Sequence, residues 1–114
     1  MPHVNSTEEL IATYRTSAIA TGTLDPKANN KHADIVHDCY KLLRQTDDGR
    51  NGILTMILDK DPFVRLWAAA HSLQWVPEKA RSVLEELRDG NGPASFTAKW
   101  TLKEFDDGAL TFDF

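Results

Sequence analysis

DPFVRLWAAAHSLQW, residues 61–75, carries the clearest signals of the fold class in this sequence. Asp61 and Pro62 open it in the order that starts a helix, because aspartate caps the free amides of the first turn and proline suits the first helical position. A helix that is apolar nearly all round needs neighbours on several sides. We therefore expect residues 62–75 to form the central helix. Its apolar residues are Phe63, Val64, Leu66, Trp67, Ala68, Ala69, Ala70, Leu73 and Trp75.

Similar start signals recur along the chain, as a capping box or as a proline after a cap or turn residue. These signals are Ser6 to Glu9, Asp25-Pro26, Val76-Pro77 and Gly92-Pro93. Together with the apolar spacing they predict helices over residues 6–21, 26–45, 50–59, 62–75, 77–89 and 93–106. Gly108 is expected to end the last helix with a positive φ. No stretch alternates with period two, so the predicted fold class is all-α.

The arrangement of these helices follows from short connections and from internal similarity. Short connections favour antiparallel neighbours joined as hairpins. An offset of 29 positions aligns an outer and an inner helix with the next such pair, and helix pairs of this kind bury their apolar faces by stacking. We expect an α–α superhelix of about three hairpins in one domain, residues 1–114, with a short extended tail over about 108–114. The aligned pairs are Leu54/Val83, Leu58/Leu87, Trp67/Phe96, Ala69/Ala98 and Leu73/Leu102.

Composition narrows the class of protein. The net charge is −4, from 17 acidic and 13 basic residues, and the basic residues are scattered, so nucleic acid is not an expected partner. No apolar run approaches the roughly 20 residues that cross a bilayer, so no membrane partner is expected either. The single cysteine, Cys39, cannot form an internal disulfide, and residues 1–10 lack the pattern of a secretion signal. These features predict a protein of the reducing cytoplasm.

The stretch Leu58 to Ala69 resembles the HEAT-repeat pattern, in which an acidic turn and a proline precede Val-Arg and then small residues. Residues Pro77 to Leu84, followed by Ala98 and Leu102, resemble a next repeat that lacks Val-Arg. The run from about residue 28 to 112 is similar to a small bacterial family of uncharacterised HEAT-like proteins. The family is matched at Asn30-Lys31, Val64-Arg65-Leu66, Ala68-Ala69, Pro77-Glu78, Ala80-Arg81 and Asp107-Gly108.

This resemblance implies an armadillo-like α–α superhelix of HEAT-like hairpins and carries over no catalytic residue. Some small HEAT-like bacterial proteins of similar appearance are thought to act as immunity proteins against toxins, an analogy at the level of the fold.

Arg65 is the charged residue of the most apolar predicted helix. Its guanidinium needs partners for its donors, and a carboxylate satisfies them in a bidentate pair. We expect a structural ion pair with Asp59, with Asp61 or with an acidic residue of helix 77–89. Contact with a partner protein is the alternative role.

The second predicted helix carries residues that suggest metal binding or catalysis. His37 and Cys39 are two positions apart and point to different faces, whereas ligand pairs on a helix sit three or four apart. No second cluster with ligand spacing occurs, so neither a metal nor another cofactor is expected. Cys39 is expected in the core. A Cys39–His71 catalytic pair is not excluded by the sequence.

The candidate partner surface consists of two tryptophans and of polar positions on the helices expected to form the inner layer, 26–45, 62–75 and 93–106. Aromatic residues are enriched where proteins bind one another. Trp67, aligned with Phe96, is instead expected in the core. The candidates for the partner surface are Lys31, Asp38, His71, Gln74, Trp75, Lys99, Trp100 and Lys103.

Three hypotheses for function follow. The leading one is a non-catalytic module that binds another protein or peptide, with an immunity- or inhibitor-like protein as one form. The second is a small helical enzyme or cofactor-handling accessory protein, which requires a deep polar pocket near His37, Cys39 or His71. The third is a homo-oligomeric structural subunit joined through a tail that contains Phe112 and Phe114.

Overall fold

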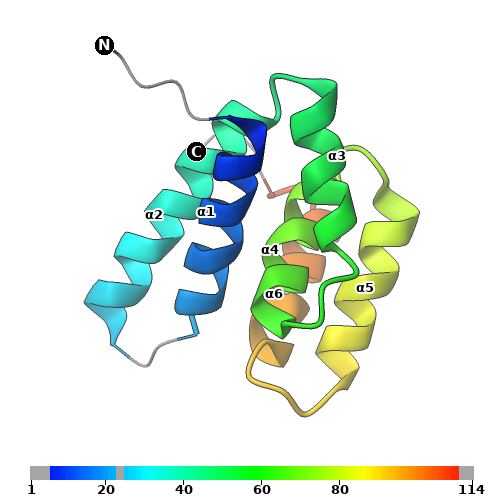
Figure 1. Ribbon diagram of the computed structural model, residues 1–114. Coiled ribbons are helices and arrows are strands. Elements are labelled where there is room, and N and C mark those ends of the chain that lie inside the picture. Colours follow the sequence, from blue (N-terminus) through cyan, green and yellow to red (C-terminus); the bar gives the residue numbers. More distant parts are fainter. Residues whose placement is uncertain (1–5, 23–24, 111–114) are drawn as a thin grey trace. The chain divides into compact units, whose positions relative to one another are not determined.

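The computed structural model describes residues 6–22 and 25–110. Within these ranges the structure contains six α-helices and no strand, which confirms the predicted all-α fold class, and adjacent helices pack together (Figure 1). The helices are α1 (Thr7–Ala20), α2 (Pro26–Leu43), α3 (Asp47–Met56), α4 (Pro62–Ser72), α5 (Pro77–Asp89) and α6 (Ser95–Asp106).

The chain divides into two compact units, Met1–Ile53 and Leu54–Phe114, and the division falls within α3. The single domain expected from the sequence therefore stays a prediction. The predicted extended tail lies partly outside the described residues, because residues 111–114, including Phe112 and Phe114, are not among them.

Three of the predicted helix starts are confirmed by their capping bonds. The Ser6 hydroxyl accepts from the Glu9 amide at 3.1 Å, and the Asp25 carboxylate accepts from the Lys27 amide at 3.1 Å. The Asp61 carboxylate accepts from the first free amides of α4, at 2.9 and 3.2 Å. Each bond satisfies an amide that has no partner inside the helix. The start predicted at Pro93 is wrong, because α6 begins at Ser95.

The predicted boundaries of the third helix are also wrong by three residues. The helix spans Asp47–Met56 instead of residues 50–59. The Thr46 hydroxyl accepts a hydrogen bond from the Gly49 amide at 3.0 Å and so caps the helix. Asp47 and Asp48 lie in the first turn, where the positive end of the helix dipole stabilises their carboxylates. The sequence pattern does not mark this cap, because Thr46 is followed neither by a proline nor, three positions on, by the acidic residue of a capping box.

The first unit is built on a hairpin of α1 and α2, which lie side by side and run in opposite directions (Figure 1). Its core contains Tyr14 and Ala18 from α1 and Val36, Tyr40 and Leu43 from α2, all at helical spacing and all fully buried. Burial holds the pKa of the Tyr14 hydroxyl well above its ordinary value, so this phenol stays protonated.

Gly49 allows the chain to turn tightly from α2 into α3. A Cβ atom at this position would lie 1.9 Å from the carbonyl oxygen of Leu43. Because that oxygen belongs to the main chain, a side chain at position 49 could be accommodated only by moving one of the two helices.

The second unit is an array of α4, α5 and α6, in which each helix runs opposite to the one before it (Figure 1). Helix α5 packs against both α4 and α6, and α4 also contacts α6. The apolar stripe predicted for α5, formed by Ala80, Val83, Leu84 and Leu87, is buried as expected.

Helix α4 is apolar but is not covered all round. Val64, Leu66 and Ala68 are buried, whereas Trp67 is only half-buried. The expectation that Trp67 lies in the core is therefore wrong in part. On a helix a residue adjacent to two core positions points about 100° away from each, which brings it to the edge of the buried face.

In burial the internal similarity holds for two of the aligned pairs, both in the second helix of each helix pair, and fails for Trp67 with Phe96, because Phe96 is 70% exposed. Ala69 with Ala98, and Leu73 with Leu102, are buried at both positions. Leu58 is 72% exposed, while its counterpart Leu87 is 8% exposed. The reason is the early end of α3 at Met56, which leaves Leu58 in the turn that follows.

Gly108 ends α6 with a φ of 74°, as predicted. The Ala109 amide donates to the Glu104 carbonyl at 2.8 Å and the Gly108 amide donates to the Phe105 carbonyl at 3.2 Å. These two bonds are those of a Schellman motif, which favours glycine because its central residue is left-handed.

Candidate functional site

Helix α6 presents an exposed aromatic pair. Ala98 and Leu102 are buried, so the residues on the opposite side of the helix face outward. Phe96 is 70% exposed and Trp100 is 44% exposed. Their ring centroids are 6.1 Å apart and the rings meet edge to face at 67°. Aromatic rings at this separation attract each other, so the pair forms an ordered apolar surface.

Charged residues flank the aromatic pair on both sides. Lys103 Nζ donates to the Asp107 carboxylate at 2.8 Å, which raises the pKa of Lys103 above its ordinary value. Lys99 and Glu104 are exposed, and neither forms an ion pair within the part of the chain that the structure describes. We call this surface the α6 outer face. It consists of Phe96, Lys99, Trp100, Lys103, Glu104 and Asp107.

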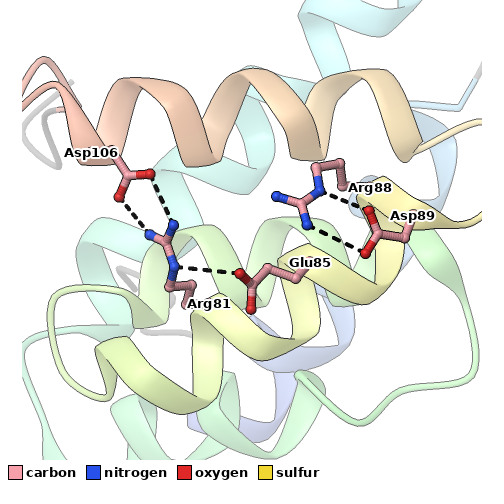
Figure 2. A network of polar contacts seen from close by, with 5 residues as sticks. All are labelled: Arg81, Glu85, Arg88, Asp89 and Asp106. Carbon is pink, nitrogen blue, oxygen red and sulfur yellow. Dashed lines mark hydrogen bonds and ion pairs between the residues drawn. The ribbon is translucent and has the colours of Figure 1, made fainter.

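An open depression of about 390 Å³ adjoins the start of this face. It is lined by Arg88, by the turn of residues 90–93, and by Ser95, Phe96 and Lys99. The Ser95 hydroxyl donates to the Arg88 carbonyl at 2.6 Å, which holds the turn against the end of α5. Arg88 pairs with the adjacent Asp89, and this bond lowers the pKa of Asp89 (Figure 2).

A bidentate ion pair fastens α6 to α5. Arg81 Nη1 and Nη2 donate to the two carboxylate oxygens of Asp106 at 2.5 and 2.9 Å, and Arg81 Nε lies 3.6 Å from Glu85 (Figure 2). The hydrogen bond from Arg81 lowers the pKa of Asp106 and raises that of Arg81. Because the pair joins the C-terminal end of α6 to α5, it helps to set the orientation of the α6 outer face.

Of the eight predicted surface residues, Lys99, Trp100 and Lys103 come together on the α6 outer face. Lys31 and Asp38 are exposed on α2, in the first unit. Gln74 is exposed and Trp75 is half-buried, both in the turn between α4 and α5. The Gln74 amide donates to the His71 carbonyl at 2.9 Å, so this side chain caps the end of α4.

The placement of His71 on the partner surface is wrong, because this residue is 1% exposed. His71 follows the buried Val64 and Ala68 by seven and three positions, which puts it on the same inward stripe of α4. Its ring lies 5.9 Å from the Trp67 ring, at an angle of 40°. The residue contributes to packing and cannot touch a partner from this position.

The predicted ion pair of Arg65 takes another form. Arg65 Nη1 donates to the main-chain carbonyls of Asp59 and Lys60, at 3.0 and 3.1 Å. The Asp61 carboxylate caps α4, and the Asp59 carboxylate accepts from the Asp61 amide at 2.9 Å. Arg65 therefore closes the turn between α3 and α4 through main-chain oxygens instead of the two carboxylates, because the carboxylates serve the amides of that turn.

His37 and Cys39 of α2 lie in partly or fully buried positions. Cys39 is 5% exposed, as expected of a core residue, and burial raises the pKa of its thiol. Burial also lowers the pKa of His37. A protonated thiol is a poor nucleophile and a poor metal ligand. Within the described residues, no group of three or more His, Cys, Asp or Glu side chains is placed to share a metal ion.

Phe96 is the surface residue that the sequence did not predict. The alignment with Phe96 was used only to predict a core position for Trp67, and no position was predicted for Phe96 itself. The spacing of α6 contained the signal for its exposure, since Ala98 and Leu102 mark the inward stripe and Phe96 lies about 160° from Ala98 around the helix. Two small or apolar residues four positions apart mark the buried side of a helix, and residues on the opposite side are exposed.

The chain matches no protein-family model, no curated protein and no solved structure. Among the described residues, no helix combines the length and the apolar character that crossing a membrane requires. What the fold and the α6 outer face define is an all-α chain of packed helical hairpins with an exposed aromatic surface.

Proposed function

We propose that this protein is a non-catalytic protein-binding module and that the α6 outer face is its contact surface. The observation that carries the proposal is the exposure of Phe96 and Trp100 beside each other on one helix face. Covering a phenylalanine side chain from water contributes about 1.5–3 kcal/mol, so an exposed ordered pair favours association. Tryptophan and other aromatic residues also dominate the energetics of protein interfaces.

The surroundings of the pair support the same role. Aromatic residues bordered by charged ones form the usual arrangement of an apolar interface centre with a polar rim. The Arg81–Asp106 pair and the Schellman motif hold α6 at its C-terminal end, so little order has to be gained on binding. The resemblance to HEAT-like proteins agrees with a protein-binding role, because stacked helical hairpins present extended surfaces to other proteins. An immunity- or inhibitor-like role is one concrete form of the proposal.

Affinity capture with a matched control tests this function. Tagged wild-type protein, a Phe96→Ala/Trp100→Ala variant and a Leu58→Ala control are used as baits in cells that naturally produce the protein. Leu58 is an exposed apolar residue of the turn after α3, outside the α6 outer face. We expect the wild type and Leu58→Ala to retain the same stoichiometric partner. The amount of this partner recovered with the double variant should be at least about tenfold lower.

Complexes are crosslinked in the cells before capture so that weakly bound partners are retained, and the readout is quantitative mass spectrometry, in which further copies of this chain count as a partner. Circular dichroism melting shows whether each bait is folded. Equal recovery of the partner by the double variant and the control would contradict the proposal, as would a wild-type bait that retains no stoichiometric protein.

A further inference from the structure

We propose that the partner at the α6 outer face is a second copy of this chain, with the two α6 helices side by side and parallel about a two-fold axis. This inference rests on the proposed function and names its partner.

The exposed residues of α6 have the spacing of a helix-pairing seam. Phe96, Trp100, Lys103 and Asp107 follow one another at intervals of four, three and four residues. In a parallel pair of helices such positions face the partner helix, with Trp100 and Asp107 at one kind of seam position and Phe96 and Lys103 at the other. The two copies would therefore meet first through Phe96 and Trp100.

The flanking charges match a second copy of the same helix. At about 100° per residue, Lys99 lies roughly 60° to one side of Phe96 and Glu104 roughly 80° to the other. A two-fold axis parallel to the helices brings opposite flanks together, so Lys99 of each copy faces Glu104 of the other. Two intermolecular ion pairs would form on the two edges of one seam.

Both residues are available for these pairs. Lys99 and Glu104 are exposed, and in the described part of the chain neither is engaged in an ion pair, whereas Lys103 is bonded to Asp107 and Arg81 to Asp106. An antiparallel pair of helices would place like flanks together and would separate Lys99 from Glu104. The charge pattern therefore selects the parallel orientation.

The expected association is weak. Helix α6 has 12 residues and is about 18 Å long, and each copy contributes two aromatic side chains to the seam. The area that two such helices bury is at the lower end of the range for specific interfaces, and complexes of this size are usually weak and depend on protein concentration. Lys103 and Asp107 further limit the strength, because polar residues at seam positions reduce stability while they specify register.

Charge reversal tests the pairing and its orientation. Sedimentation equilibrium is measured for the wild type, for Lys99→Glu, for Glu104→Lys and for an equimolar mixture of the two variants, at roughly 10 µM to 1 mM. We expect a reversible dimer for the wild type and at least about tenfold weaker dimerisation of each single variant. The mixture should dimerise again. On one edge of the seam the acidic side chain introduced by Lys99→Glu faces the basic one introduced by Glu104→Lys, and on the other edge the native Glu104 and Lys99 face each other.

The mixture controls for folding, since two variants that had failed to fold could not restore each other. A Lys79→Glu variant controls for the change in net charge, because Lys79 is exposed on α5. A wild type that is monomeric throughout, or a mixture no more dimeric than its components, would overturn the inference. If the wild type is monomeric but the capture experiment still loses another protein on Phe96→Ala/Trp100→Ala, the second copy is wrong and the binding function stands.

Discussion

At the scale of residues, Gly49 and Phe96 control two different properties of this protein. At position 49 the absence of a Cβ atom lets the main chain of α3 lie close to the Leu43 carbonyl. At position 96 the exposed phenylalanine completes the aromatic pair on α6. The consequences differ, because the first residue affects stability and the second affects association.

Replacing Gly49 by alanine should destabilise the protein. Alanine favours a helix by up to about 1 kcal/mol over glycine, but its Cβ would meet the Leu43 carbonyl oxygen at 1.9 Å. We expect a net loss of about 1–3 kcal/mol in the free energy of unfolding, measured by urea denaturation. Gly92→Ala is the matched control, since nothing lies within 4 Å of a Cβ there. A Gly49→Ala variant as stable as the control would show that the turn can relax.

At the scale of elements, the orientation of α6 depends on what fastens it to α5. The apolar contacts of Ala98 and Leu102 bury one side of α6, and the Arg81–Asp106 pair ties its C-terminal end. The pair is exposed to solvent, so its contribution depends on pH and on salt.

Acid should weaken the contribution of Asp106. Its pKa is lowered in the folded protein by the bond from Arg81, so its stabilising effect is present above the pKa of an unfolded aspartate and is lost as pH falls through the folded pKa. We expect the wild type to melt at a higher temperature than Asp106→Asn near about pH 6, and this difference to shrink as pH falls toward about 3.

The control for this titration is Glu86→Gln, which removes an exposed carboxylate of α5 outside the ion-pair network. The difference in melting temperature between the wild type and Asp106→Asn should change more steeply with pH than the difference between the wild type and Glu86→Gln. A difference that is constant from about pH 6 to about pH 3 would show that the ion pair does not stabilise the packing of α5 and α6.

At the scale of the whole molecule, the two units contain different chemical reporters. The single cysteine, Cys39, belongs to the unit Met1–Ile53, and all three tryptophans belong to the unit Leu54–Phe114. Cys39 is buried and its thiol has a raised pKa, so it reacts slowly while its unit is folded.

The prediction of a single domain can be tested with these reporters. If residues 1–114 unfold as one cooperative unit, the urea midpoint from thiol labelling of Cys39 should coincide with the midpoint from tryptophan fluorescence. We expect the two midpoints to agree within about 0.2 M urea, given ordinary uncertainties of such curves. Two separate transitions would show that the units are separate domains.

The candidate site could be predicted from the sequence only in part. Lys99, Trp100 and Lys103 were recognised because they are polar or aromatic positions of one helix, and the structure places them together. Phe96 is missing from the predicted surface residues although it is exposed, and His71 was predicted on the surface although it is buried. The burial of each depends on which stripe of its helix packs inward, whereas His71 was placed on the surface only because it is a polar position of a predicted inner helix.

The fold class and most helix starts could be predicted from the residues alone, because caps, prolines and helical spacing act through bonds between neighbours in the chain. Three features became clear from the packed helices and not before: the solvent-exposed face of α6, the burial of His71, and the bonds of Arg65 to main-chain oxygens. These outcomes depend on packing between segments distant in the sequence, and such packing leaves no local pattern from which a side chain's surroundings can be inferred.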